Sequence, residues 1–406
     1  MNKAGEICNE GVEEYRKGNM EGALRLFELA KQEDPNLFDA VINKASIYLA
    51  RKEYDKALEE VDGILSKFPR AYRALTMKSE IFLDSGDFEN AGRFADLAVK
   101  NSLGVEGPLI AKANVLMKTS RLDEAGELYA KALKLSPDNV PALRNMRFLL
   151  MSKGEWEKAL PFASRVADET SLEEDLLAEG VVLEHVDRER ADSFYMSMSD
   201  EHPSYPGLAL AGAGIAERAG DSSRAVEFYK RAAVAIDVDE RSDPDEMAEM
   251  AFVLAKGGEL EIAWKLVSSP LLAKNANVLF AAAMISIAKG DLALAESSLR
   301  SALEKDPGNV KCSDYLLGIL QKQGRDEEFS IALEENFALK YGAKVPDEEK
   351  MILFRFCVKA GRYERACEII DSISLGAMGI TAEQRELLKS RILSAGANLH
   401  AHSALA

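Results

Sequence analysis

The chain has few of the residues that form covalent or metal-bound frameworks. Its 406 residues include four cysteines, four histidines and two tryptophans. Cys8, Cys312, Cys357 and Cys367 are scattered without paired spacing or a nearby histidine, which argues against a disulfide framework and against a zinc site. We therefore expect buried thiols and no metal.

Long apolar runs and amino-terminal signals are also missing. The longest apolar run, residues 276–288, falls short of the about 20 residues that a transmembrane helix needs. Residues 1–17 carry charges throughout and have no apolar signal core. These absences predict a cytoplasmic protein without membrane insertion, in which residues 276–288 form a buried helix.

Motifs of catalytic chemistry are missing as well. The Gly212-Ala213-Gly214 segment lacks both a preceding strand and the third glycine of a dinucleotide-binding loop, so it indicates close helix packing instead. The acidic cluster Glu173-Glu174-Asp175 is typical of a solvated helix face. Since no nucleophile, metal or phosphate motif is present, we expect no enzyme, no catalytic residue and no cofactor.

Basic residues are scarce in the middle of the chain. The net charge is −17, and residues 151–250 hold 10 basic and 24 acidic residues, while the rest of the chain is nearly balanced. Nucleic-acid binding depends on lysine and arginine that neutralise phosphates. Nucleic acid is therefore not an expected ligand.

The chain does contain an alanine that returns every 34 residues, and a fixed period of that size indicates a helical repeat array. A glycine stands five residues before several of these alanines, an aromatic residue three before or four after, and a proline twelve after. The regular anchors are Ala23, Ala57, Ala91, Ala125 and Ala159.

Each period contains two apolar runs at helical spacing, which predicts an antiparallel helical hairpin. The first helix carries a small residue twelve before the anchor (Gly11, Ala45, Ser79, Ala113), although Arg147 and Glu179 depart from this rule. The pattern resembles the tetratricopeptide repeat family. That resemblance implies an all-α, right-handed superhelical solenoid of about eleven hairpins, closed by a C-terminal capping helix.

After Ala159 the repeats are less regular. The later anchors are Ala191, Ala225, Ala263, Ala295 and Ala366, with Phe329 in the place of one alanine. One unusually long polar connection is expected, at 237–245. Thr381 and Gln384 predict a capping box. The expected boundaries are 1–170 for five regular repeats, 171–240 for two acidic repeats, 241–380 for four divergent repeats, 381–395 for the capping helix and 396–406 for a frayed tail.

The family resemblance also implies which residues bind a partner, because first helices line the concave groove of such proteins. Asparagine suits a peptide backbone, since its amide both donates and accepts hydrogen bonds. Three asparagines lie fourteen residues before their anchors, a fourth lies one turn away, and two arginines could meet an acidic group. These candidates are Asn9, Asn43, Asn145, Asn114, Arg73 and Arg144; an ordinary solvated face explains the asparagines equally well.

Acidic residues at first-helix positions of the middle repeats form a second candidate set. They are Glu173, Glu184, Glu217, Asp245 and Glu249. They predict a basic peptide segment as ligand, and acidity that serves solubility is an equal alternative.

The resemblance allows one known mode of binding to be tested. A clamp for the carboxylate tails of Hsp70 or Hsp90 would place lysines and asparagines where this chain has Cys8, Val12, Asn43, Arg73 and Met77, so such a tail is disfavoured. We expect a scaffold or adaptor that holds a partner protein or peptide in its groove. The alternative is a structural subunit of a larger complex that uses repeat edges as obligate interfaces.

Overall fold

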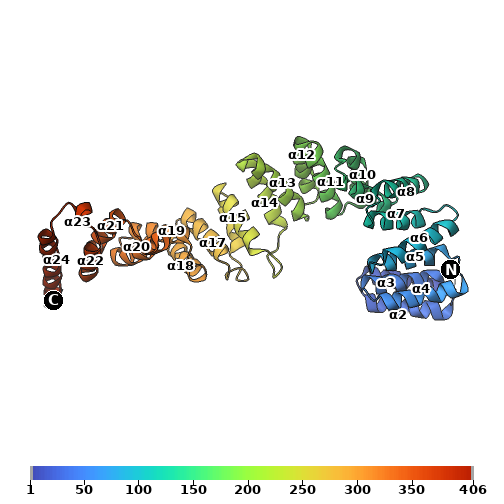
Figure 1. Cartoon of the computed structure of the whole chain (residues 1–406), viewed down its shortest axis with the longest axis horizontal. Helices are drawn as coiled ribbons and strands as arrows, with labels where there is room; N and C mark the ends of the chain where they lie inside the picture. The colour runs from blue at the N-terminus through green and yellow to red at the C-terminus, as the bar shows by residue number, and fades with distance from the viewer. Residues whose placement is uncertain (1–2, 404–406) are drawn as a thin grey trace. The chain divides into compact units, whose positions relative to one another are not determined.

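A computed structural model describes residues 3–403, with side chains from residue 3 to residue 395. These residues form helices and no strands (Figure 1), which confirms the all-α prediction. The chain divides into two compact units, Met1–Met198 and Ser199–Ala406, and the boundary falls within one helix.

The first unit consists of consecutive helical hairpins of similar length. Its helices are α1 (Lys3–Arg16), α2 (Met20–Glu33), α3 (Phe38–Ala50), α4 (Tyr54–Lys67), α5 (Tyr72–Asp84), α6 (Phe88–Asn101), α7 (Glu106–Lys118), α8 (Leu122–Leu135), α9 (Val140–Ser152), α10 (Trp156–Thr170), α11 (Glu173–Val186) and α12 (Arg188–Glu201), the last of which contains the boundary.

The second unit continues with hairpins of less even length. Its helices are α13 (Pro206–Ala219), α14 (Ser222–Ala235), α15 (Pro244–Lys256), α16 (Leu260–Val267), α17 (Ala276–Lys289), α18 (Leu292–Lys305), α19 (Val310–Lys322), α20 (Asp326–Tyr341), α21 (Asp347–Lys359), α22 (Tyr363–Asp371), α23 (Leu375–Met378) and α24 (Ala382–Ser403).

The anchor alanines lie where the two helices of each hairpin meet. Each exposes no more than 1% of its surface, so the space at this position accepts little beyond a methyl group. The small residue on the first helix has the matching role: a Cβ added at Gly11 would lie 2.7 Å from the ring of Phe27. Glycines also occupy this contact at Gly180, opposite Tyr195, and at Gly212, opposite Phe228. The prediction of close helix packing is therefore confirmed at Gly212.

A left-handed residue separates the two helices of each regular hairpin. Gly18, Gly86 and Gly154 have φ between 71° and 86°. Lys52 and Ser120 occupy the same position in the second and fourth repeats, with φ of 58° and 61°. A side chain with a Cβ is disfavoured in this conformation. The backbone geometry is thus kept throughout the regular repeats, at some energetic cost where glycine is missing.

We therefore expect Lys52→Gly to raise the free energy of unfolding by about 0.5–1 kcal/mol, because glycine relieves the steric cost of the left-handed conformation although it adds entropy to the unfolded chain. Lys52→Ala is the matched control and should bring no gain, since alanine keeps the Cβ. Chemical denaturation of both variants measures the difference. A stabilised Lys52→Ala variant would contradict the explanation.

Charged residues connect neighbouring repeats at one recurring position. In three repeats, the residue just before the left-handed turn is a cation that pairs with the preceding repeat. Its partner is the acidic residue two positions before the anchor alanine of that preceding repeat. Arg51 Nη1 lies 2.8 Å from Glu21 Oε1, Lys153 Nζ 2.7 Å from Asp123 Oδ1, and Lys289 Nζ 3.0 Å from Glu261 Oε1. The residue before the left-handed turn thus forms an ion pair with the preceding repeat at these three places.

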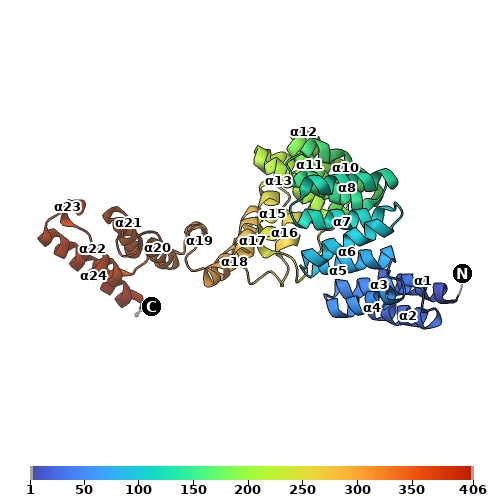
Figure 2. The ribbon, with the colours of Figure 1, turned by 45° about the vertical axis from the view of Figure 1, so that its right-hand side comes forward.

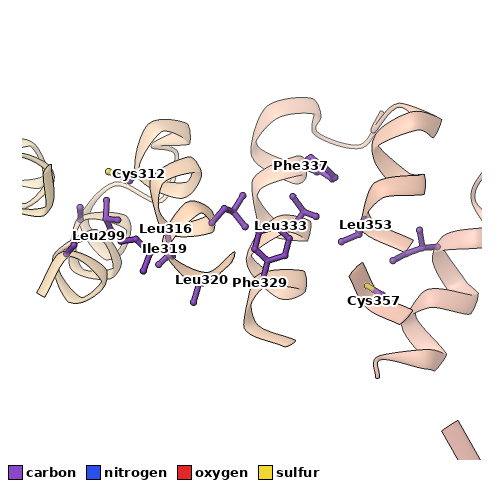
Figure 3. Packing of buried hydrophobic residues seen from close by; sticks show 14 of the residues in the cluster. Leu299, Cys312, Leu316, Ile319, Leu320, Phe329, Leu333, Phe337, Leu353 and Cys357 are labelled. Atoms are coloured by element: carbon purple, nitrogen blue, oxygen red, sulfur yellow. The ribbon is translucent and has the colours of Figure 1, made fainter. Parts of the chain in front are cut away.

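Buried side chains of successive helices form a continuous core in the second unit. Figure 3 shows it passing from Leu299 through Leu316 and Phe329 to Leu353. Phe329, which replaces an anchor alanine, packs with its ring 4.5 Å from that of Phe356. The four cysteine thiols are all buried, as predicted. The apolar run at 276–288 forms α17, whose inner face is buried.

The C-terminal helix begins with the predicted capping box. Gln384 Oε1 accepts a hydrogen bond from Thr381 N at 2.9 Å, and Thr381 Oγ1 accepts one from Gln384 N at 3.2 Å. Figure 2 shows the resulting α24 beside α22, where Ile392 is buried and Lys389 pairs with Asp371 at 2.7 Å. The helix continues to Ser403, past the expected boundary at 395; residues 404–406 of the expected tail lie outside the described residues.

The connections differ from the sequence-based expectation at two points. The predicted long polar connection lies between α14 and α15 at residues 236–243, so Pro244 and Asp245 of the predicted segment belong to α15. A second one, residues 268–275, follows the short helix α16 and was not predicted. Pro270 explains this second connection, because proline cannot continue a helix. The segment instead forms turns, in one of which Leu272 N donates a hydrogen bond to Ser269 O at 3.1 Å.

Candidate functional site

The two asparagines of the fourth and fifth repeats are joined directly. Asn114 Oδ1 accepts hydrogen bonds from Tyr129 Oη at 2.6 Å and from Asn145 Nδ2 at 2.8 Å. Among the described residues, Asn114 Nδ2 and Asn145 Oδ1 make no further hydrogen bond. The amino group of Asn114 and the amide oxygen of Asn145 therefore remain available, and together they can complement a peptide unit.

The other two asparagines do not share this arrangement. Asn43, on α3, directs Nδ2 towards Cys8 Sγ at 3.9 Å and is half-buried. Asn9, on α1, is exposed and lines a cavity of about 520 Å³ together with Glu6, Glu10 and Glu13. The equal spacing in sequence thus gives three different environments.

Both candidate arginines have carboxylate partners within the chain. Arg73 Nη1 lies 2.5 Å from Asp39 Oδ1. Arg144 donates from Nε to Asp175 Oδ1 at 3.0 Å, and its Nη2 lies 3.3 Å from Glu174 Oε1. An acidic group of a partner would have to compete with these contacts.

The partner of Arg144 belongs to a buried polar cluster that sequence reasoning missed. Asp175 is 1% exposed, and it also accepts from Arg147 Nη1 at 3.2 Å and from Thr170 Oγ1 at 2.9 Å. The prediction of a solvated face for Glu173-Glu174-Asp175 is therefore wrong for Asp175. A signal was present, because Arg147 occupies a small-residue position and a buried arginine requires an anion.

The acidic candidates fall into different parts of the structure. Glu217, on α13, and Glu249, on α15, line one cavity of about 660 Å³ with Val226, Val253 and Lys256. Glu217 Oε1 accepts a hydrogen bond from Tyr229 Oη at 3.1 Å. Burial and the nearby carboxylates of Glu217 and Glu249 raise the pKa of Tyr229, so its hydroxyl stays protonated and keeps donating.

The remaining three acidic candidates lie outside this cavity. Asp245 Oδ1 accepts from Asn277 Nδ2 at 2.9 Å and from Asn275 Nδ2 at 3.1 Å, and these hydrogen bonds lower the pKa of Asp245. Glu184 Oε1 accepts from Tyr195 Oη at 3.2 Å, and Glu173 lies half-buried in the first turn of α11. Glu173 and Glu184 belong to the first unit, and the other three to the second.

The described residues contain neither a metal-ligand cluster nor a membrane-spanning helix. No group of three or more histidine, cysteine, aspartate or glutamate side chains there is placed to hold a metal ion. None of the described helices is long and apolar enough to cross a membrane.

The stacked hairpins, their buried alanines and their left-handed turns define a helical-repeat protein. The tetratricopeptide repeat family matches residues 15–81 and 116–175, which contain the regular repeats. The resemblance to the tetratricopeptide repeat family is therefore confirmed over these residues.

Individual relatives cover different shares of the chain. The BBSome complex member BBS4 homolog of Drosophila melanogaster is 25% identical over 307 residues, which are 73% of this chain and 55% of that protein. Tetratricopeptide repeat protein 21A of Homo sapiens is 25% identical over 32% of this chain and 10% of its own length. The chain thus spans about half of the length of the first relative and about a tenth of the length of the second. The solved structure of a thermophilic TPR protein of Thermus thermophilus is 21% identical, covers 45% of this chain and 98% of its own, and has a TM-score of 0.40.

Proposed function

We infer that the chain is a non-catalytic protein-interaction scaffold that binds a basic segment of a partner protein. The observation that carries the inference is the cavity in which Glu217 and Glu249, from neighbouring first helices, face the same space. Two carboxylates that share a cavity repel each other, and a cationic ligand would relieve that repulsion.

The surroundings of the cavity fit a peptide side chain. Val226 and Val253 supply apolar surface for an aliphatic stem, and the Tyr229 hydroxyl orients Glu217. Lys256 also lines the cavity, with Nζ 4.3 Å from the ring centroid of Phe252. The open donor and acceptor of Asn114 and Asn145 offer a separate contact to peptide backbone in the first unit.

The test compares a lysine–alanine peptide with a glutamate–alanine peptide of the same length. We expect only the lysine peptide to bind, and its affinity to fall as salt screens the charges. The double variant Glu217→Gln, Glu249→Gln should reduce that affinity about tenfold, since two solvent-accessible ion pairs contribute about 0–1 kcal/mol each.

The matched control removes the same charge elsewhere in the second unit. Glu304 and Glu335 are exposed, so the double variant Glu304→Gln, Glu335→Gln should bind like the wild type. Equal binding of both peptides, or equal losses in the two double variants, would leave acidity as a solubility feature.

A second candidate function is a structural subunit of a multiprotein complex. The BBS4 homolog of Drosophila melanogaster, which matches 73% of this chain, is named as a member of the BBSome complex. Affinity purification from the native cell separates the two functions. A single stoichiometric set of partners favours the subunit, and many substoichiometric partners favour the scaffold.

A further inference from the structure

The first unit contains a carboxylate without a partner. Glu80, on α5, is partly buried, and none of the described residues gives it a hydrogen bond or an ion pair. It lines a cavity of about 370 Å³ on α5, between α3 and the start of α7. A half-buried carboxylate without a protein partner loses part of its hydration, so its presence calls for an explanation.

The cavity has apolar walls, and two of its polar lining groups are engaged elsewhere. Ile42, Met77, Val105 and Pro108 contribute apolar walls. The Tyr72 hydroxyl also lines the cavity but gives Glu80 no hydrogen bond. Thr76 Oγ1 donates to Tyr72 O at 2.9 Å, and the Arg73 guanidinium is held by Asp39.

We propose that this cavity binds a cationic side chain of a partner protein, whose aliphatic stem lies against Ile42, Met77 and Val105 and whose charged head pairs with Glu80. Charge complementarity supports this occupant, because the unengaged charged groups of the lining, Glu80 and Glu106, are both acidic. A lysine side chain combines the apolar stem and the single cationic head that such a cavity fits.

Protonation provides an independent readout. Removal of the Glu80 carboxylate from water raises its pKa to about 7. The charged groups that line the cavity with it are Arg73 of α5, paired with Asp39 of α3, and Glu106 of α7; α4 and α6 contribute no lining residue. A bound cation favours the ionised carboxylate, so binding should release a proton and strengthen as pH rises through 7.

The probe is Nα-acetyl-lysine methylamide, compared with Nα-acetyl-norleucine methylamide, which has the same stem without the charge. Methyl resonances of Ile42, Met77 and Val105 in the full chain report binding by NMR. We expect the lysine probe to bind about tenfold more tightly than the norleucine probe, and Glu80→Gln to abolish both this difference and its pH dependence.

Glu89→Gln is the matched control, since Glu89 is exposed on the adjacent helix α6 and should leave binding unchanged. An unaltered thermal transition shows that Glu80→Gln is folded. Equal binding of both probes, or lysine binding that survives in Glu80→Gln, would overturn the proposal. The inference rests on the scaffold function, but its failure leaves the peptide test at Glu217 and Glu249 unaffected, because the probes, the residues and the unit all differ.

Discussion

Replacing Asp175 by Asn should lower the free energy of unfolding by about 3 kcal/mol. Asp175 and the side chain of Arg147 are 1% and 13% exposed, and their ion pair joins α9 of the fifth repeat to α11 of the sixth. Asparagine keeps the shape but leaves the buried guanidinium without a countercharge. Chemical denaturation of the full chain measures the loss.

Glu174→Gln is the control for this prediction, because Glu174 is 72% exposed and also lies near Arg144. An exposed ion pair contributes about 0–1 kcal/mol, so this variant should unfold almost like the wild type. Similar losses in both variants would show that burial of Asp175 is not what matters.

The difference in the free energy of unfolding between wild type and Asp175→Asn should depend on pH, because it depends on the pKa of Asp175. Burial raises this pKa, but hydrogen bonds from Arg144 and Thr170 outweigh burial and hold it below its ordinary value. A lowered folded-state pKa contributes stability that is complete above the unfolded value of about 3.9 and is lost as pH falls through the folded value. The gap between wild type and Asp175→Asn should therefore be constant near neutral pH and narrow below pH of about 4.

Replacing Gly212 by Ala should destabilise the second unit by about 2 kcal/mol. The added Cβ would overlap the ring of Phe228, which is fully buried and cannot move without disturbing the core. Chemical denaturation of the full chain measures the effect. A second change that removes the ring, Phe228→Leu, should recover part of the loss in the double variant.

Gly214→Ala provides the control within the same helix. Its Cβ would meet only the flexible end of Arg218, at 3.4 Å, and alanine is the better helix former. This variant should be as stable as the wild type or more so by up to about 1 kcal/mol. If both substitutions destabilise equally, the contact with Phe228 is not what governs this region.

The sequence was sufficient to predict features that depend on local pattern. The anchor alanines, the capping box at Thr381 and Gln384, and the buried α17 all follow from apolar spacing and cap chemistry within a few turns. The second long connection was missed because Pro270 has no counterpart at the equivalent position of the regular repeats.

The candidate site was predictable only in part, because spacing identifies a face and not a partner. Asn114 and Asn145 were placed on first helices, but their hydrogen bond joins residues 31 apart. Arg144 and Asp175 are separated by the same interval, and each was interpreted without the other. Comparing polar residues one repeat apart would have found both pairs. Glu80 could not be found in this way, since none of the described residues pairs with it.

The ion pairs before the left-handed turns influence which hairpins dock against each other when the array folds. The buried alanine is common to the repeats, so a first helix could dock against the wrong neighbour with little loss of apolar contact. Arg51, Lys153 and Lys289 each pair with an acidic residue that the preceding repeat supplies. Exposed pairs add little stability. A first helix that carries one of these cations loses its ion pair when it docks against a repeat without the acidic residue, which gives a small preference for the native succession of hairpins.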